Sequence, residues 1–521
     1  MAGDKPPLRK HTLDKDLGKL TRIEEATVTL SRGLVAPGVA LAFLALSAVF
    51  AALYAGTGAG ALTVIAAAAI GAYMALNIGA NDVANNVGPA VGSRAMTMGG
   101  ALVLAAVCES AGALIAGGDV VSTISKGIID PATVADPDIF VAAMMAALIS
   151  SALWVNLATW IGAPVSTTHS VVGGVMGAGI AAAGFAAVNW PTMGAIAASW
   201  VISPLLGGVI AALFLAFIKA FIIYQDDKIA AARRWVPVLI AIMAGAFSAY
   251  LAMKGLKRIV DLPGSSILFL GLACAVIAWA VVNPMIRQQS EGMENRNQSL
   301  RKLFRLPLIF SAALLSFAHG ANDVANAVGP LAAVVHTAME GDVAAKVGIP
   351  LWVMVIGAIG ISMGLLLYGP KLIRMVGEQI TKLNPMRAYC VALSAAITVI
   401  IASWLGLPVS STHIAVGAVF GVGFFREWYT AKSKRRRAYL ERKQGRLKAE
   451  RKAMAGKLEN AWEAAETPWE DEEPATVQED VQRRRLVRRT HATTIAAAWV
   501  ITVPAAAVLA ALIFTILRLF A

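Results

Sequence analysis

The sequence predicts an all-α protein that crosses a membrane many times and is built from two related halves. Hydrophobic residues make up 58% of the 521 residues and charged residues only 15%, well below the roughly 25% of an average soluble domain. Most of the long apolar runs reach the ~20 residues that a helix needs to cross the hydrocarbon core. With two shorter apolar pieces, 164–182 and 408–425, they predict about 12–13 transmembrane segments, some of them broken helices.

Three sequence motifs occur twice, in the same order. Gly-Ala-Asn-Asp-Val-Ala-Asn occupies residues 79–85 and returns unchanged at 320–326. Pro-Val-Ser-Thr-Thr-His at 164–169 is matched by Pro-Val-Ser-Ser-Thr-His at 408–413, and a Trp-Val-Ile segment later closes each half. Repetition of this kind indicates an internal duplication.

The duplication and the polar segments divide the chain into seven parts. They are a polar tail (1–32), an additional N-terminal helix (33–56), a first repeat (60–223), connecting helices with a loop (224–302), a second repeat (303–425), a charged loop (426–489) and the last helix of the second repeat (490–521). Within the charged loop, 431–466 predicts a charged helix and 467–481 is acidic.

The net charge of +13 is concentrated in the tail, the loop at 286–305 and the charged loop. Basic loops of membrane proteins lie on the cytoplasmic side. This distribution therefore predicts a multi-pass protein of the inner (plasma) membrane, with its N-terminus and the 426–489 loop in the cytoplasm. It gives no indication of nucleic-acid binding.

Each copy of the heptapeptide places a carboxylate and two carboxamides beside an apolar run. A charge at the bilayer centre costs at least about 2.5 kcal/mol, so Asp82 and Asp323 indicate function. Gly-Pro pairs at 88–89 and 329–330 are expected to interrupt the two helices, because proline removes a backbone donor. Such paired motifs are typical of the ion and substrate sites of secondary transporters.

The Pro-Val-Ser motifs resemble the first turns of helices, where free amides and hydroxyls favour an anion. A single motif of this kind would be read as a helix cap, whereas two matched copies favour a binding site. Glu109 lies in another apolar run, 99–117, and is expected on the transport pathway. His169 and His413 are expected to be hydrogen-bonded structural residues.

These motifs resemble those of the PiT family of inorganic phosphate transporters, the PHO4-type permeases, and more closely its sodium-dependent branch. The likeness covers nearly all of 60–425 and 490–517. It implies secondary active, cation-coupled symport of inorganic phosphate across the cytoplasmic membrane. It also implies two inverted repeats that meet near mid-membrane, and a homodimer in the lipid bilayer. The coupling ion would be Na⁺ or H⁺, with Na⁺ favoured, and no cofactor is implied.

The resemblance assigns roles to individual residues. Na⁺ would bind at Asp82 and Asp323, and cation binding or coupling would involve Asn81, Asp82, Asn322, Asp323 and Glu109. Phosphate would be bound by Asn85, Asn326, Ser166, Thr167, Thr168, Ser410, Ser411 and Thr412. One departure is Ala392, which stands where sodium-dependent relatives carry a glutamate.

Three alternatives remain open at this stage. A proton-coupled permease for phosphate or sulfate would use the same fold, and sulfate needs no carboxylate to accept a proton from it. A passive anion channel would be expected to line its pore with Arg or Lys, which the core nearly lacks. The chain is not expected to be an enzyme, because no nucleotide-binding loop or nucleophile–base–acid set stands out.

Overall fold

The structure, a computed structural model, describes residues 34–432 and 489–520, apart from 59, 131–132, 135, 164, 256–259, 261, 344–347 and 380–382. The tail 1–32, the predicted charged helix at 431–466 and the acidic stretch at 467–481 therefore fall largely or wholly outside the described residues. Within them the chain is helical, with one isolated bridge between Ile129 and Val188.

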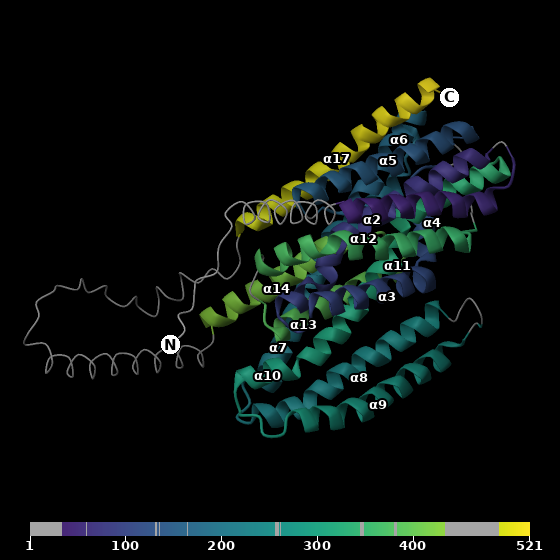
Figure 1. The fold of residues 1–521 in the computed structure, drawn as a ribbon. Helices are drawn as coiled ribbons and strands as arrows, with labels where there is room; N and C mark the ends of the chain where they lie inside the picture. The colour runs from purple at the N-terminus through teal and green to yellow at the C-terminus, as the bar shows by residue number, and fades with distance from the viewer. Residues whose placement is uncertain are drawn as a thin grey trace, which may run out of the picture.

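The first half of the chain begins with a peripheral helix, Leu34–Ala55. It continues with α2 (Ala61–Gly92), α3 (Met98–Ala116), α4 (Gly118–Ser122), the π-helical turn η1 (Thr123–Gly127), α5 (Pro137–Ile161), α6 (Thr167–Ala183), the short turn η2 (Phe185–Ala187), α7 (Trp190–Ile218) and the π-helical turn η3 (Lys219–Ile223). A hairpin and a short helix follow, namely α8 (Lys228–Lys254), α9 (Gly264–Gln289) and α10 (Asn297–Leu303). The second half comprises α11 (Arg305–Glu340), α12 (Leu351–Gln379), α13 (Pro385–Trp404), α14 (Ser411–Lys432) and α17 (Arg489–Phe520) (Figure 1).

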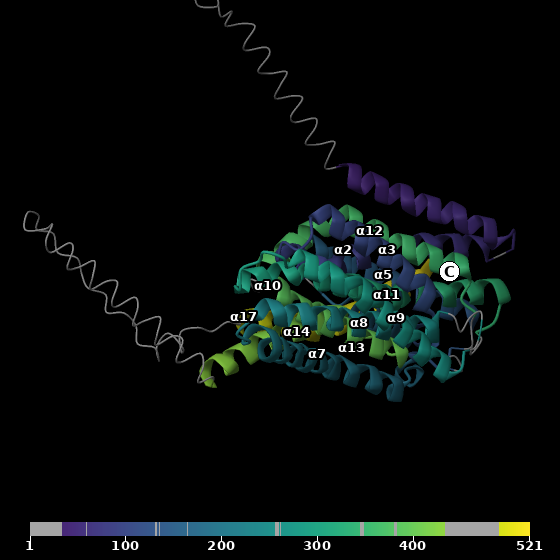
Figure 2. The same cartoon turned by 90° about the horizontal axis from the view of Figure 1, so that it is seen from below.

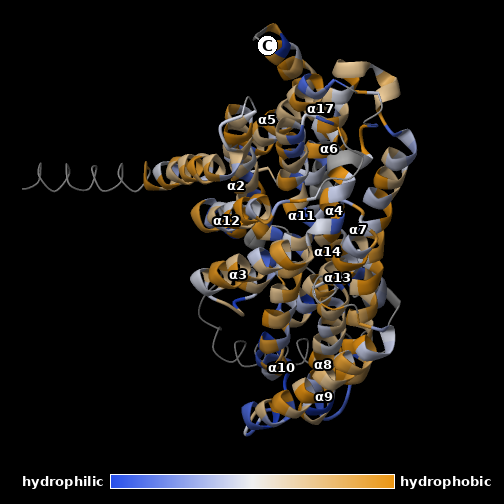
Figure 3. Ribbon diagram, turned by 90° about the vertical axis from the view of Figure 1, so that its right-hand side faces the viewer, coloured by the Kyte–Doolittle hydropathy of each residue, from blue (hydrophilic) through white to orange (hydrophobic). Residues whose placement is uncertain are grey.

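The described residues include 11 helices that are long and apolar enough to cross a membrane. Hydrophobic residues cover long stretches of the outer helices, including α8, α9 and α17 (Figure 3). Leu34–Ala55 lies at the edge of the bundle (Figure 2). The prediction of an all-α, multi-pass membrane protein is confirmed.

The two halves are related by matched contacts and are interleaved. A Cβ on Gly79 of α2 would lie 1.9 Å from the Ile361 carbonyl oxygen of α12, and one on Gly320 of α11 would lie 2.0 Å from that of Glu109 of α3. Each long motif helix therefore crosses a helix of the other half at backbone contact. Since the start of α2 meets the end of α11, at Gly60 and Ala338, the two motif helices run in opposite directions.

The same exchange occurs at the Pro-Val-Ser helices. α6 of the first half packs on α17 of the second, and α14 of the second packs on α7 of the first. Gly173 meets the backbone of Val503, and Gly417 meets that of Pro204 in the matching position. Each half is thus completed by a helix from the other, which brings both sets of motifs to the centre of the molecule.

The predicted interruptions at Gly88-Pro89 and Gly329-Pro330 are wrong. α2 continues through Pro89 to Gly92, and α11 continues through Pro330 to Glu340. The residues around Pro89 and around Pro330 are buried against neighbouring helices. A helix supported in this way tolerates the missing donor. The breaks in the fold lie instead before α6 and before α14.

Candidate functional site

The two heptapeptides and the two Pro-Val-Ser motifs meet in the middle of the bundle. Asp82 on α2 and Asp323 on α11 are each only 1% exposed. The first turns of α6 and α14 lie against them, so the hydroxyls of both motifs face the carboxylates. All eight residues predicted to bind phosphate are buried there, namely Asn85, Ser166, Thr167, Thr168, Asn326, Ser410, Ser411 and Thr412.

Two serines fix where α6 and α14 begin. Ser166 Oγ accepts a hydrogen bond from the His169 amide (3.1 Å), and Ser410 Oγ accepts one from the His413 amide (3.2 Å). Both serines are therefore helix caps, as the alternative interpretation of these motifs expected. A capping hydroxyl can still donate a hydrogen bond, but the helix that it caps fixes the orientation of the serine side chain.

Asp82 is bound by hydroxyls from both halves. Thr167 of α6 donates to Asp82 Oδ2 (2.8 Å), and Thr412 of α14 donates to Asp82 Oδ1 (2.9 Å). Asn85, one turn along α2, donates to the same Thr412 hydroxyl (2.8 Å). Through these hydrogen bonds Asp82 therefore connects the N-terminus of α6 with the N-terminus of α14.

Asp323 has a different set of partners. Ser411 donates to its Oδ2 (3.2 Å), and His319 Nε2 lies 2.9 Å from the same oxygen. Its other oxygen, Oδ1, has no hydrogen-bond partner among the described residues. The threonine that would match Thr412, Thr168, donates instead to the Val409 carbonyl (3.0 Å). The pseudosymmetric site is thus asymmetric at its charged centre.

The first asparagine of each heptapeptide holds the end of a neighbouring helix. Asn81 donates to the Thr159 hydroxyl of α5 (2.9 Å), and Asn322 donates to the Ser403 hydroxyl of α13 (3.0 Å). The oxygen of Asn322 accepts from the Val409 amide (3.2 Å), whereas Asn81 Oδ1 has no partner in the described part of the chain.

The second-repeat asparagine Asn326 points toward α6. Its amide nitrogen lies 3.1 Å from the Thr168 hydroxyl and 3.5 Å from that of Thr167. Its oxygen, Oδ1, has no partner among the described residues. Because Asn85 makes the equivalent contact with Thr412, both heptapeptides reach the hydroxyls of the opposite half.

The sequence interpretation missed His319, which lies at the centre of this charged cluster. The ring is fully buried and touches three carboxylates, with Nε2 3.8 Å from Asp82 and Nδ1 3.4 Å from Glu109, besides its contact with Asp323. The first half has Ile78 at the matching position. The signal available in the sequence was a histidine inside an apolar run, four residues before Asp323 on the same helix.

Glu109 does not touch either heptapeptide aspartate directly. Its Oε1 accepts a hydrogen bond from Asn86 (2.7 Å) and faces His319, while Oε2 has no partner among the described residues. The structure thus connects Glu109 to the aspartates through the imidazole ring. Asn86 is a second residue of this cluster that the sequence interpretation did not single out.

The predicted structural histidines pack against each other where the two halves meet. The His169 and His413 rings stand edge to face with centroids 4.3 Å apart. The centroid of the Trp200 ring lies 3.8 Å from that of His169. These histidines follow the residues whose hydroxyls bind the aspartates by one or two positions along α6 and α14. Their position agrees with a packing role.

Several oxygens of the cluster are suited to a cation. Asp82, His319 and Asp323 each offer a ligand atom, and these atoms lie within 4.8 Å of one another. The unpartnered oxygens of Asn81, Asp323 and Asn326 add further acceptors. Buried oxygen atoms without partners are costly, and carboxylate and carboxamide oxygens favour hard cations.

Comparisons with known proteins identify the family. Residues 78–510 match the PHO4 family, described as the phosphate transporter family. A relative from Helicobacter pylori strain J99 is 47% identical over 96% of this chain and 98% of its own length, and one from Pyrococcus furiosus is 40% identical over 68% and 86% respectively. Both carry the name “Putative phosphate permease”.

A solved structure titled “The sodium-dependent phosphate transporter” shares this fold. It has a TM-score of 0.73 and 34% identity, and the match covers 88% of this chain and 100% of that one. Residues 78–510, which match the family, contain both copies of each duplicated motif and the buried polar centre. The chain therefore belongs to the phosphate transporter family, PHO4, and is a multi-pass membrane transporter of phosphate.

Proposed function

We propose that the chain couples the uptake of inorganic phosphate to Na⁺ by symport. The observation that supports this most strongly is the meeting of two buried aspartates with hydroxyls from both halves. Thr167 and Thr412 bind the two oxygens of Asp82, while Asp323 keeps one oxygen without a partner. The same centre thus holds acceptors for a cation beside donors for an oxyanion.

The charges at the site make the binding of phosphate and the binding of Na⁺ depend on each other. Asp82, Asp323 and Glu109 are buried close together around one histidine. An anion placed beside such carboxylates in a medium of low dielectric is strongly repelled. Na⁺ at Asp82 and Asp323, with carboxamide oxygens of Asn81 and Asn322 nearby, would remove this repulsion. Phosphate binding then requires prior or simultaneous cation binding, which is the basis of coupling.

The phosphate donors are proposed to be the hydroxyls that now bind protein oxygens. Thr167, Thr168, Ser411 and Thr412 each donate to a carboxylate or a carbonyl. Once Na⁺ neutralises the aspartates, these hydroxyls can turn to phosphate oxygens, supported by Asn85 and Asn326. Ser166 and Ser410 are proposed to contribute through the helix N-termini that they cap.

The alternation between the two sides is proposed to use the interleaved halves. α6 packs on α17 and α14 on α7, so the site lies where two exchanged units meet. Rocking of such units around a central site is typical of transporters with inverted repeats. The resemblance to the sodium-dependent branch further supports a homodimer in the inner membrane with a cytoplasmic N-terminus.

The proposal is tested by the uptake of radiolabelled phosphate into proteoliposomes. An inward Na⁺ gradient is expected to drive uptake at constant pH, and excess sulfate is expected not to compete. A proton gradient without Na⁺ is expected to drive none. Uptake that follows the proton gradient alone, or that sulfate suppresses, would contradict sodium-coupled phosphate symport.

His319→Gln is expected to lower the initial rate of uptake by about tenfold to a hundredfold. The imidazole places one ring nitrogen near Asp323 and the other near Glu109, whereas glutamine has a single amide nitrogen in place of these two. A hydrogen bond to a charged group contributes about 1.5–3 kcal/mol. Initial rates in proteoliposomes measure the effect.

The matched control is His336→Gln on the same helix. His336 is partly exposed and faces Asp342 at the end of α11, away from the aspartates. This variant is expected to keep full uptake. Unchanged uptake by His319→Gln at equal protein content would show that the ring does not organise the carboxylates.

A further inference from the structure

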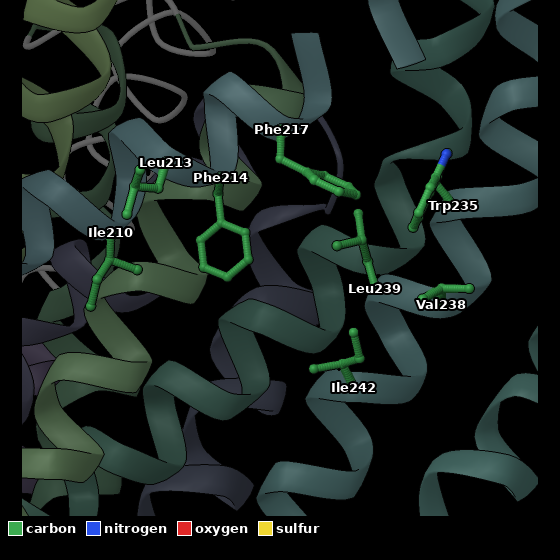
Figure 4. A pocket seen from close by; sticks show the side chains of 8 residues that line it. All are labelled: Ile210, Leu213, Phe214, Phe217, Trp235, Val238, Leu239 and Ile242. Atoms are coloured by element: carbon green, nitrogen blue, oxygen red, sulfur yellow. The ribbon is translucent and has the colours of Figure 1, made fainter. Parts of the chain in front are cut away.

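A cavity of ≈ 410 Å³ lies between α7 and α8, and none of the candidate site residues lines it. Ile210, Leu213, Phe214 and Phe217 line it from α7, and Trp235, Val238, Leu239 and Ile242 line it from α8 (Figure 4). These side chains present only apolar surface to the cavity. Phosphate and Na⁺ therefore have no ligand here, and the transport site does not use this space.

α8 contacts the bundle through α3, α10, α11 and η3. η3 contacts α8 at one end, and at the other Lys254 forms an ion pair with Asp119 of α4. Along the middle, α8 packs mainly on α9, which it crosses closely at Gly245 and Gly271. The α8–α9 hairpin lies at the edge of the bundle (Figure 1), and the cavity lies between α8 and α7.

The rim of the cavity is exposed, on helices that are expected to face the hydrocarbon of the membrane. α7 and α8 both belong to helices long and apolar enough to span a bilayer. Leu213 and Ile242 at its rim are 64% and 63% exposed. A wholly apolar cavity that opens toward lipid tails is filled most favourably by a hydrocarbon chain.

One end of the cavity is aromatic and basic. Phe217 and Trp235 pack edge to face there, with ring centroids 5.1 Å apart. The exposed Arg234 places its guanidinium 5.6 Å from the centroid of the Trp235 ring. A Trp beside basic residues is typical of the membrane–water interface.

Neighbouring basic side chains are engaged elsewhere. Arg233 Nε donates to the Ser290 hydroxyl (2.6 Å), and Lys219 lies over the Tyr429 ring (4.0 Å to the centroid). Asp227 is engaged too, because its carboxylate caps α8 through the amides of Ile229 and Ala230. The guanidinium of Arg234 is therefore placed to contact a polar group of a ligand at this end of the cavity.

We propose that this cavity binds an anionic phospholipid, with an acyl chain between α7 and α8 and its phosphate on Arg234. Basic pockets between membrane helices bind anionic headgroups in this way. The lipid fills the gap between the hairpin and the bundle and so fixes α8 against α7. This site is separate from the transport site and does not depend on the coupling ion.

Native mass spectrometry of the purified full chain tests this proposal. Phosphatidylglycerol and phosphatidylcholine of equal chain length are added at equal concentration, and bound lipid is counted. Phosphatidylglycerol is expected to be retained preferentially. Arg234→Gln is expected to lower its retention by about fivefold, since one basic residue near a headgroup contributes about 1 kcal/mol. Arg305→Gln, an exposed arginine at the start of α11, is the matched control and is expected to have no effect.

A second pair of variants tests the acyl site. Val238→Trp fills the cavity and is expected to abolish retention of both lipids. Leu213→Trp is expected to have the same effect, and because Leu213 lies at the exposed rim, this variant is expected to impair folding less. Val209→Trp, on an exposed position of α7 outside the lining, is expected to change nothing. Equal retention of the two lipids with no effect of Arg234→Gln would overturn the proposal. So would a Val238→Trp variant that keeps its lipid but loses a dimer, because a second copy would then occupy the cavity.

Discussion

Asp82→Asn is expected to reduce sodium-driven phosphate uptake by at least about 100-fold. Both carboxylate oxygens accept hydroxyl hydrogen bonds, one from Thr167 and one from Thr412. An asparagine keeps a single acceptor and loses the charge that would hold Na⁺. The loss of one hydrogen bond to a charged group costs about 1.5–3 kcal/mol, and the loss of the proposed Na⁺ ligand adds to this cost, so sodium-coupled uptake is expected to fail.

Asp119→Asn provides the matched control. This aspartate side chain is 52% exposed and pairs with Lys254 at the end of α8, and it is not among the buried polar residues of the site. Its uptake is expected to stay close to that of the parent protein. Initial rates of radiolabelled phosphate uptake at several Na⁺ concentrations measure both variants. Full sodium-dependent uptake by Asp82→Asn would refute the proposed role of this carboxylate.

The sequence predicted the site because its motifs are duplicated. Identical heptapeptides in two halves occupy equivalent positions, so Asp82 and Asp323 could be paired before the fold was known. The crossed contacts could not be predicted in the same way. Thr412 binds Asp82 and Asn326 binds Thr168 because α6 and α14 are exchanged between the halves. Motif spacing along the chain carries no information about that exchange.

His319 was missed because it breaks the repeat. The identical heptapeptides begin one residue later, and the matching residue in the first half is the apolar Ile78. Comparison of the two halves therefore gave position 319, which lies between the apolar run and the heptapeptide, no role. The error about Pro89 and Pro330 has a different source, since tertiary packing supports a helix that local proline chemistry alone would interrupt.

Gly79→Ala is expected to have the largest effect on stability. A Cβ at this position would lie 1.9 Å from the Ile361 carbonyl oxygen and 2.9 Å from the Leu365 amide nitrogen. Small residues allow membrane helices to approach to backbone contact, and here backbone atoms of α12 would have to move. Overpacking a core costs about 1–3 kcal/mol and sometimes more. We expect a clear drop in Tm in detergent and a loss of uptake, because Gly79 lies one turn from Asp82.

The second repeat provides a replicate of this prediction, and α3 provides a control. Gly320→Ala, the matching position of α11, would bring a Cβ within 2.0 Å of the Glu109 carbonyl oxygen and is expected to be equally harmful. Gly99→Ala in α3 has open space around the new methyl group, so it should leave Tm unchanged or raise it slightly. If Gly79→Ala and Gly320→Ala matched Gly99→Ala in Tm, the close crossings of α2 with α12 and of α11 with α3 could not be what holds the aspartates in place.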